Sequence, residues 1–528
     1  MLPSVIQVSL DGQNVQDLAP FMLALDCTVV EEINQHTTTV VRFREPPSDR
    51  FFFESQIGKR MVVTVSVNFT RQTQQQEVFN GFVQRVDADW ELNGSAILTF
   101  TGISDSFKLD TFNHSQTFRS STLADVAKRM GIKTNVKDLP ADLMNMLQFN
   151  ETDWSFANRL ADRFGCFLMA AGAFKVGGLE TETIMADGFG ANAVQLAWRS
   201  EDGLTRFRSS GQLKPHLVFG VNFESKTATS KETLEIGDVP AEDSMPELRS
   251  AAFNGSGALG LTSALWNRYL LSSHEGFEKQ VNFESQRQIM SQCRGFGESR
   301  SPLLAVGRTI EITGNPDING KYGLIKIIHR WGTTEGYRNE FECTPFKKYM
   351  SPVAPKMDRY FGPEIARVVE TSPPGPRGAS VRVQFQWEKE NETNFIPVVM
   401  PNAGPDRGIC FVPEVGDEVL VSFRGGDSCK PFVMGSLWNG VDLPPLKDLH
   451  GGEYPPNDLK RIVTKSGNRL VFDDKPGKET MVMATPNHVR VSLFDGGQTL
   501  VLHSDGDVHI HAGGTVHMKC KQFLREVG

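Results

Sequence analysis

Two histidines near the C-terminal end have the type and spacing of metal ligands. His509 and His511 are two residues apart, so in a β-strand their side chains would point to the same face. If three such strands met around a three-fold axis, six imidazoles would come together, a ligand set that suits octahedral iron. Their neighbours Val508 and Ile510 belong to an apolar series described below, which places the histidines on the solvent side. The sequence therefore predicts no metal site, and His509 and His511 are the two residues that would overturn this prediction.

A glycine pattern typical of dinucleotide-binding loops occurs at Gly255–Gly260, which reads GSGALG. Such a loop follows a buried strand, but the preceding residues 248–253 read LRSAAF and form no convincing strand. We interpret the pattern as a turn and a helix cap. The stretch from Gly314 to Tyr322 does not match the phosphate-binding motif G-x-x-x-x-G-K-[ST]. Gly314 and Gly320 are one residue too far apart, and Tyr322 stands where the motif needs a Ser or Thr hydroxyl to bind Mg²⁺. No cofactor is expected.

No set of nucleophile, base and orienting residue stands out in the sequence. Neither the G-x-S-x-G motif of serine hydrolases nor the H-E-x-x-H motif of zinc proteases occurs. We interpret the adjacent carboxylates Asp473 and Asp474 as a hairpin turn rather than as an acid–base pair. No catalytic residue is predicted, which favours a structural protein over an enzyme.

Length and charge restrict the remaining possibilities. The chain has 528 residues, which allows three or four domains at about 150 residues each. Its 55 basic and 63 acidic residues leave a formal net charge of -8, which argues against a nucleic-acid binder that relies on broad neutralisation of phosphates. Hydrophobic residues make up 39% of the chain, which is enough to build folded cores.

The cysteines indicate a reduced protein. Their number is odd and no two form a C-x-x-C pair, so neither a disulfide framework nor a zinc knuckle is expected. The N-terminus lacks a basic region followed by an apolar run, and the most apolar stretch, Phe164–Phe174, is about half the ~18–20 residues that span a bilayer. We therefore expect assembly in the cytosol without a signal peptide. The seven cysteines are Cys27, Cys166, Cys293, Cys343, Cys410, Cys429 and Cys520.

The first 350 residues predict β structure with short helical insertions. Segments such as Met61–Phe69 and Ser95–Ile103 alternate between apolar and polar residues, and the turn pair Asn93-Gly94 precedes the second, which predicts antiparallel strands. Further strands are expected between residues 175 and 250 and over Leu303–Phe346, where breaks fall at Asn315-Pro316 and Gly336.

Three segments in this region have helical character. Apolar residues three and four apart predict a helix over Ser121–Met130, capped by Ser121 or Thr122. A second helix is expected to start at Thr152 or Asp153 and to stop at Gly165, before an apolar strand at Cys166–Ala170. A third is expected over about Leu261–Ser273.

The composition changes near residues 350–360, where prolines accumulate. From Gly362 to Gly440, five or six short strands joined by Gly/Pro turns suit a small closed barrel. Residues 441–456 are rich in Pro, Gly, Asp and Leu and form a predicted linker. The barrel contains Phe385 and Trp387, which we expect in a core or an oligomer contact rather than on a ligand-binding face.

Apolar pairs recur every eight residues in the last part of the chain, with glycines between them. A period of eight with one apolar face per strand is typical of a β-helix or β-prism. Three repeats in one chain cannot bury that face, so we predict that several chains wrap around a common axis. An ordinary sheet edge is the alternative. The predicted inward residues are Leu500, Leu502, Val508, Ile510, Val516 and Met518.

Several stretches of the sequence resemble VgrG-type spike proteins of contractile injection systems. VRVQFQW (Val381–Trp387), FVPEVGDEVLVSF (Phe411–Phe423) and PFVMGSLWNG (Pro431–Gly440) are similar to that family's oligonucleotide/oligosaccharide-binding (OB) barrel, and TKSGNRLVFDD (Thr464–Asp474) to the start of its trimeric β-helix. QTFRSSTLADVAKRMGI, NETDWSFANRLADRFGCF and YGLIKIIHRW are similar to its tail-hub region.

This resemblance implies a mainly β protein with minor α structure. Residues 1–350 would form a tail-hub region of two β-barrel domains with helical insertions, 351–440 the OB barrel, 441–456 a linker and 457–528 a trimeric β-helix needle. The six inward residues would then be the trimer core. The linker is far too short to hold the lysozyme domain that some phage spikes carry.

The resemblance also implies a function and partners. The chain would be the non-enzymatic hub and spike of a type VI secretion system, an extracellular contractile injection system or a contractile phage tail. It would form a homotrimer. Its partners would be an inner-tube protein, baseplate wedge proteins, a PAAR-type tip protein and effector cargo, and it would contact the target membrane only transiently. The alternatives are a glycan-degrading tail enzyme and a protein that binds glycan or nucleic acid through the OB barrel.

Overall fold

A computed structural model describes most of the chain. The described residues are 4–20, 22–45, 54–119, 121–136, 146–170, 182–224, 229–236, 239–266, 274–352, 362–372, 378–428, 430–445 and 457–525. The chain divides into two compact units, Met1–Ser436 and Leu437–Gly528. Cys429, the boundary at 353–361 and most of the predicted linker, residues 446–456, lie outside the described residues. In the described part, no helix has the length and hydropathy needed to cross a membrane.

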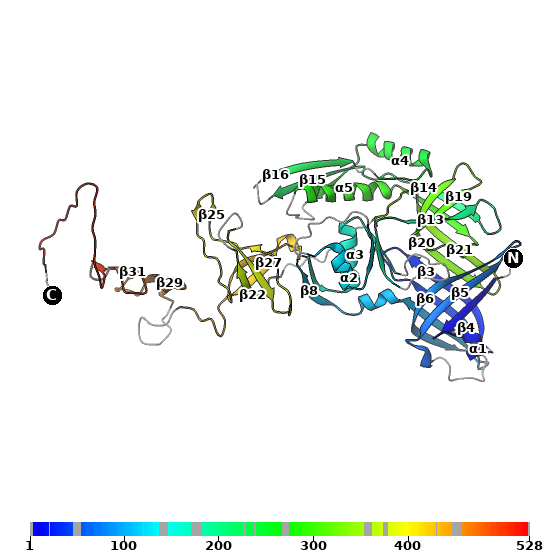
Figure 1. The fold of residues 1–528 in the computed structure, drawn as a ribbon, viewed down its shortest axis with the longest axis horizontal. Helices are drawn as coiled ribbons and strands as arrows, with labels where there is room; N and C mark the ends of the chain where they lie inside the picture. The colour runs from blue at the N-terminus through cyan, green and yellow to red at the C-terminus, as the bar shows by residue number, and fades with distance from the viewer. Residues whose placement is uncertain are drawn as a thin grey trace. The chain divides into compact units, whose positions relative to one another are not determined.

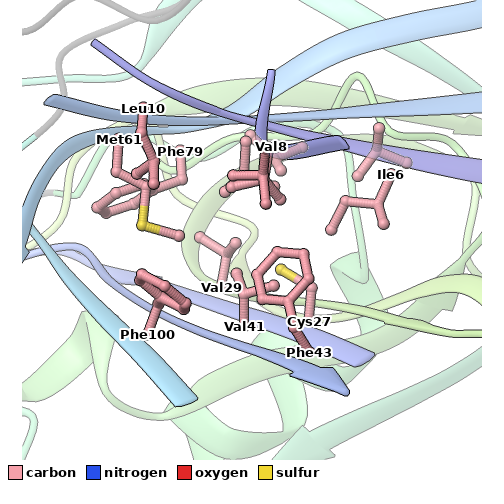
Figure 2. Packing of buried hydrophobic residues seen from close by; sticks show 14 of the residues in the cluster. Ile6, Val8, Leu10, Cys27, Val29, Val41, Phe43, Met61, Phe79 and Phe100 are labelled. Carbon is pink, nitrogen blue, oxygen red and sulfur yellow. The ribbon is translucent and has the colours of Figure 1, made fainter. Parts of the chain in front are cut away.

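The N-terminal strands form an antiparallel sheet that curves around an apolar core. The predicted alternating segments become β5 and β7, and Gly94 adopts a φ of 85° in the turn before β7, so these predictions are confirmed. Figure 2 shows the core, in which Met61, Phe79 and Phe100 pack against residues of β1, β3 and β4. The strands are β1 (Ser4–Leu10), β2 (Gln13–Asn14), β3 (Leu23–Glu32), β4 (Thr38–Glu45), β5 (Arg60–Asn68), β6 (Thr73–Trp90) and β7 (Ala96–Ser104), with a short helix α1 (Val15–Leu18) after β2.

The curved N-terminal strands β1–β7 are the first ring of the sheet, and the same sheet continues into a second ring. Its order is β14-β18-β21-β20-β19-β13, and a bridge between Trp198 and Leu204 links the first and last strands. Gly336 makes the turn between β20 and β21, as its position in the sequence predicts. The strands are β13 (Gly190–Ala197), β14 (Leu204–Gly211), β18 (Cys293–Ser299), β19 (Arg308–Thr313), β20 (Gly320–Gly332) and β21 (Gly336–Thr344).

The two rings share β20 and β21 (Figure 1). The first part of β20, Gly320–Gly323, pairs with β19, whereas Lys326–Gly332 pairs with β3 of the first ring. Correspondingly, Tyr337 of β21 lies in the core of the first ring and Phe341 in that of the second. One long hairpin thus contributes to both cores.

A module of short strands and two helices follows the first ring. Thr122 caps α2 through a capping box with Asp125, Thr152 caps α3, and Gly165 adopts a φ of 68° just after α3, so both predicted helices are confirmed. The elements are the 3₁₀ helix η2 (Asp105–Asp110), β8 (His114–Phe118), α2 (Leu123–Arg129), β9 (Lys133–Asn135), β10 (Met146–Glu151), α3 (Asp153–Arg163), β11 (Phe167–Met169) and β12 (Ile184–Ala186).

The helix predicted over Leu261–Ser273 is wrong for the residues that the structure describes. Thr262–Trp266 is strand β17, and 267–273 lie outside the described residues. The helices on either side are α4 (Pro246–Ala258) and α5 (His274–Met290). β17 is stabilised by parallel pairing with β15 (Leu217–Glu224), which also pairs with β16 (Thr229–Ile236). α5 covers one face of this small sheet through Phe277 and Val281.

Residues 362–436 form a small barrel, as the density of short strands predicts. The sheet order is β24-β23-β22-β27-β28, and a bridge between Val398 and Val433 brings the two edges together. Phe385 is buried in its core. The strands are β22 (Glu364–Thr371), β23 (Ser380–Phe385), β24 (Ile396–Pro397), β27 (Glu418–Phe423) and β28 (Pro431–Ser436), with a two-stranded arm, β25 (Ala403–Gly404) and β26 (Arg407–Gly408).

The second unit is an antiparallel meander followed by residues without strands. Each strand pairs with the next one along the chain, and no strand is assigned among residues 504–525. A trimeric β-helix therefore stays a prediction for this segment. The strands are β29 (Leu459–Val463), β30 (Arg469–Asp473), β31 (Thr480–Ala484), β32 (Arg490–Phe494) and β33 (Thr499–His503).

Candidate functional sites: the hub–barrel joint and the needle face

Strand β10 carries residues of the module into the core of the small barrel. β10 pairs with β8, and its Leu147 is only 2% exposed among the barrel's core residues. The ring of Phe149 packs against Trp387, with ring centroids 5.8 Å apart. The barrel core is thus completed by side chains that lie more than 200 residues earlier in the chain. We call this contact the hub–barrel joint.

Polar contacts surround the hub–barrel joint. The backbone N–H of Thr117 on β8 donates to Oε2 of Glu388 at 2.8 Å, and Arg119 forms an ion pair with Glu392. The side chains of Arg119 and Glu392 are about one-third exposed, so their attraction is partly screened by water. Apolar packing at Leu147 and these polar contacts together fix both strands to the barrel.

Helix α3 holds the other side of β10. Arg159 donates to the carbonyl oxygen of Leu147 at 3.1 Å and to Oε1 of Glu151 at 2.5 Å. Further along α3, Asp162 forms a buried ion pair with Arg287 of α5, with 2.7 Å between the nearest oxygen and nitrogen. One helix therefore contacts both the joint and the long helix of the neighbouring sheet.

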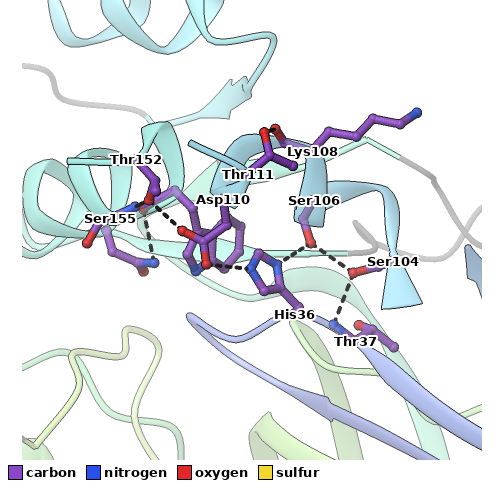
Figure 3. A network of polar contacts seen from close by, with 11 residues as sticks. His36, Thr37, Ser104, Ser106, Lys108, Asp110, Thr111, Thr152 and Ser155 are labelled. Carbon is purple, nitrogen blue, oxygen red and sulfur yellow. Dashed lines mark hydrogen bonds and ion pairs between the residues drawn. The ribbon is translucent and has the colours of Figure 1, made fainter. Parts of the chain in front are cut away.

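The N-terminal end of α3 is bound to the turn between β3 and β4 (Figure 3). Thr152 donates from its hydroxyl to Oδ1 of Asp110 at 2.5 Å, and Oδ2 of Asp110 lies 3.3 Å from Nε2 of His36. The imidazole also packs against the ring of Trp154 of α3, with ring centroids 4.3 Å apart and the ring planes tilted by 34°. On its other side, Nδ1 of His36 lies 2.7 Å from the hydroxyl of Ser106. We call this set, with Thr37 and Ser104, the His36 cluster.

Asp110, His36 and Ser106 have the residue types of a hydrolase triad, but their surroundings do not suit catalysis. Ser106 is 1% exposed, and its hydroxyl is 2.8 Å from the hydroxyl of Ser104. A nucleophile must meet its substrate at an open site, whereas this serine is enclosed. The three residues hold elements together. Sequence reasoning missed the His36 cluster because His36 lies about 70 residues before its partners, with no local motif.

The C-terminal segment, residues 457–528, which we call the needle segment after the prediction above, presents an apolar face on its strands β29–β33. On each strand of the meander, alternate residues line up with those of the next strand through the pairing register. Val471 and Ser492 lie at the centre of the other face of the meander and are buried within the single chain. The two aligned rows, apolar except for Lys460, are Ile462–Leu470–Met483–Val491–Leu502 and Lys460–Phe472–Met481–Leu493–Leu500.

These two rows, which we call the needle face, are open to solvent in a single chain. Leu500 is 60% and Leu502 57% exposed. Each row lines an open depression, one of about 450 Å³ and the other of about 440 Å³. A contiguous exposed apolar face of this kind marks an interaction site.

The six residues predicted as the trimer core fall into two groups. Leu500 and Leu502 lie on β33 within the needle face. The other four follow the last described strand, are exposed in the single chain, and stay a prediction: Val508, Ile510, Val516 and Met518. The earlier apolar pairs on β30, β31 and β32 were missed, although their alternation is visible in the sequence.

The remaining motifs have structural explanations. The glycine pattern at Gly255–Gly260 covers the C-terminal part of α4, and Gly260 adopts a φ of 61° just after the helix, as in a helix cap. Asp473 ends β30, and Asp474 begins the connection to β31. Among the described residues no group of three or more His, Cys, Asp or Glu could hold a metal ion. The rings of His509 and His511 stack at a centroid distance of 6.0 Å.

Two family profiles match this fold. "Phage tail baseplate hub (GPD)" matches residues 30–335, more than half of the chain. "Type VI secretion system/phage-baseplate injector OB domain" matches residues 364–438, which contain the small barrel.

Curated relatives match over part of their length. The type VI secretion system spike protein VgrG4b of Pseudomonas aeruginosa is 30% identical over 225 residues, covering 35% of this chain and 27% of the relative. The actin cross-linking toxin VgrG1 of Vibrio cholerae is 25% identical over 216 residues, covering 35% of this chain and 19% of that protein. The chain thus matches about a quarter or less of the length of these two relatives.

Solved structures share the fold at low sequence identity. A chain of the Francisella PdpA–VgrG complex in its half-lidded state has a TM-score of 0.61 at 10% identity, covering 95% of this chain and 88% of that one. The Escherichia coli c3393 protein, a type VI secretion component with similarity to phage T4 gp27 and gp5, has a TM-score of 0.54 at 13% identity, covering 81% of this chain and 99% of its own.

Proposed function

Because the chain belongs to the phage tail baseplate hub family and is a VgrG-type spike protein, we propose that it is the non-enzymatic hub and spike of a contractile injection apparatus. Three copies would assemble, connect the inner tube and baseplate to the tip, and puncture the target envelope when the sheath contracts. The needle face carries this proposal: two apolar rows are exposed in one chain, and two further copies would cover them.

The mechanism is mechanical. A spike driven into an envelope must pass force from its base to its tip without unfolding. Two features of the unit Met1–Ser436 support this role: the hub–barrel joint places Leu147 inside the barrel core, and α3 binds the same strand through Arg159. Both contacts resist separation of the small barrel from the module that precedes it.

The proposed partners follow from the family. They are an inner-tube protein, baseplate wedge proteins, a PAAR-type tip protein and effector cargo, with only transient contact with the target membrane and none with nucleic acid. Assembly would take place in the bacterial cytoplasm without a signal peptide, in a phage-tail-like particle that is then released or expelled toward a target cell.

The test is the mass of the protein in solution, measured with and without the needle segment. For the full chain we expect three times the chain mass of 58.6 kDa, because the needle face is buried only between copies. The variant that lacks residues 457–528 should lose trimerisation. A well-behaved full-length monomer would contradict the proposal.

The same purified protein tests the alternatives. Hydrolysis of peptidoglycan or surface glycan would favour a tail enzyme. Binding to oligosaccharides or single-stranded nucleic acid would favour a ligand-binding barrel, which usually presents exposed aromatic rings. Phe385 is buried, and Trp387 stacks on it at a centroid distance of 4.7 Å, so these two rings are poorly placed as such a platform.

A further inference from the structure

The hydrogen bonds of the His36 cluster form a chain from Thr37 to Asp110, and the two ends of this chain determine which group donates at each step. The backbone N–H of Thr37 donates to the hydroxyl oxygen of Ser104 at 3.1 Å. The hydroxyls of Ser104 and Ser106 are 2.8 Å apart, and that of Ser106 is 2.7 Å from Nδ1 of His36. At the other end Asp110, as a carboxylate, only accepts, so it takes a hydrogen from Nε2 of His36.

A neutral imidazole with its hydrogen on Nε2 satisfies every member of this chain. Ser104 then donates to Ser106, Ser106 donates to Nδ1, and Nε2 donates to Asp110. The other tautomer would place a bare nitrogen against the carboxylate, with no hydrogen between them. The geometry therefore fixes both the protonation state and the tautomer of His36.

Protonation of His36 reverses the order. Nδ1 would carry a hydrogen and donate to Ser106. One serine hydroxyl hydrogen is then left with no acceptor among the described residues: that of Ser104 if Ser106 donates to Ser104, or that of Ser106 if Ser104 still donates to Ser106. Both serines are 1% exposed, so water cannot readily take that hydrogen. A buried donor without an acceptor is costly.

The charged groups around the cluster are mostly engaged with one another. On η2, Asp105 pairs with Arg60 and with Lys108. On α3, Asp153 lies 3.3 Å from His114 of β8. Asp110 is the charged group in contact with His36 itself.

Burial lowers the pKa of the His36 imidazole below its usual value, and the hydrogen bond and charge of Asp110 oppose this effect without overcoming it. The folded protein therefore binds this proton less readily than the unfolded chain does. The stabilisation is complete above the ordinary histidine pKa of about 6.5 and is lost as the pH falls through and below that value.

We infer that His36 is a pH-sensitive clamp that holds α3 to the β3–β4 turn at neutral pH and releases it in mild acid. The N-cap Thr152 and the ring of Trp154 contact the cluster, and Arg159 on the same helix holds β10 at the hub–barrel joint. Release at one end of α3 therefore loosens the support of the strand that completes the barrel core. The inference depends on contacts within one chain and holds whether or not the proposed spike function is correct.

Hydrogen exchange of the full-length protein tests the clamp. Peptides that cover residues 146–163 are followed between pH 7.5 and pH 5.5, after correction for the intrinsic pH dependence of exchange. We expect protection to fall below about pH 6.5, with the opening constant rising at most tenfold per pH unit, because one proton is taken up. Peptides from β1 and β5, which hold no residue of the His36 cluster, should keep their protection.

Three variants separate the outcomes. His36→Gln should abolish the pH dependence, whereas His114→Gln, which removes the neighbouring histidine, should keep it. Asp110→Asn should leave the onset of the loss near pH 6.5 and make the loss larger toward pH 5.5, since the carboxylate favours the charged imidazole in the folded protein. This variant replaces His36→Gln as the test if His36→Gln does not fold. Protection of 146–163 that is independent of pH in the native protein, or unchanged pH dependence in His36→Gln, would overturn the inference.

Discussion

Arg287 carries a positive charge into the interior of the molecule. Its side chain is 4% exposed and forms ion pairs with Asp162 at 2.7 Å and with Glu284 at 3.0 Å. Burial disfavours the charged guanidinium, but the two carboxylates outweigh burial and raise its pKa above the usual value. The guanidinium also donates to the carbonyl oxygen of Ser351. This side chain therefore connects α3, α5 and the chain after β21.

Removing Arg287 should destabilise the protein strongly. Arg287→Ala removes the ion pair from the buried carboxylate of Asp162, and we expect a loss of about 3–5 kcal/mol in the free energy of unfolding. Arg206→Ala removes an exposed ion pair with Glu298 and should cost less than about 1 kcal/mol. Urea unfolding of both variants measures the difference. Equal destabilisation would show that burial of the pair has no energetic consequence.

Burial also determines which cysteines can react. Desolvation raises the pKa of the Cys27 and Cys166 thiols to about 12 and that of Cys293 to about 11, so little thiolate forms at neutral pH. Cys410 and Cys520 are exposed in the single chain. Those two thiols are therefore available as chemical probes of the folded protein.

At the scale of secondary-structure elements, the hub–barrel joint shows that the small barrel is stabilised by residues outside its own stretch of sequence. The barrel strands begin at Glu364, yet their core includes Leu147 from β10. The barrel and the preceding module thus share one set of apolar contacts. We expect their stabilities to be coupled.

Leu147→Ala should therefore weaken the barrel although it lies outside the barrel sequence. Loss of a buried leucine side chain costs about 2–5 kcal/mol, and hydrogen exchange in β23 and β27 should accelerate as a result. Leu92→Ala, at a fully exposed leucine, is the matched control and should change nothing. Exchange in β23 that is insensitive to Leu147→Ala would mean that the barrel is stable without the joint.

Local signals explain which elements were predictable. Thr122 with Asp125 and the Asn93-Gly94 turn act through neighbours in sequence, and both were predicted with nearly correct boundaries. Helices α4 and α5 were missed. α5 packs on the β15–β16 sheet through Phe277 and Val281 and also pairs with α3 through Arg287, so burial on several sides obscures its apolar stripe. The joint and the His36 cluster depend on contacts between distant residues, which no periodicity reveals.

At the scale of the whole molecule, the needle segment of a single chain exposes apolar side chains to solvent. The apolar pairs that follow β33 in the sequence are also exposed in the single chain, and the assembly proposed above would bury them together with the needle face. Two measurements at the C-terminal end test this directly.

Charge substitution should discriminate the two faces of the terminal segment. Val508→Asp or Ile510→Asp would place three like charges near one axis and should prevent trimerisation, because a buried unpaired charge is expensive. His509→Ala, between them, should leave the trimer intact. Size-exclusion chromatography with light scattering provides the readout, and disruption by His509→Ala alone would mean that the face assignment is reversed.

Alkylation gives the same information without any mutation. Cys520 is two residues after Met518, so in a strand it would lie on the same predicted inward side. Assembly should therefore protect it, whereas Cys410 on the small barrel should react rapidly. Mass spectrometry of labelled peptides identifies each site. Rapid labelling of Cys520 in the assembled protein would place that side chain outside.

The hairpin β20–β21 has a consequence for how such proteins can be recombined. Both rings of the hub obtain part of their wall from these two strands, and Lys326–Gly332 is paired to β3, about 300 residues earlier in the chain. A chimera that exchanges one ring between two homologues must therefore exchange half of a strand, or accept a mismatched core in the other ring. Because the hub–barrel joint also binds β10 to the barrel core, natural and engineered crossovers should tolerate breakpoints before β1 or after β28 and fail between them. The hub and the small barrel would then be inherited as one piece.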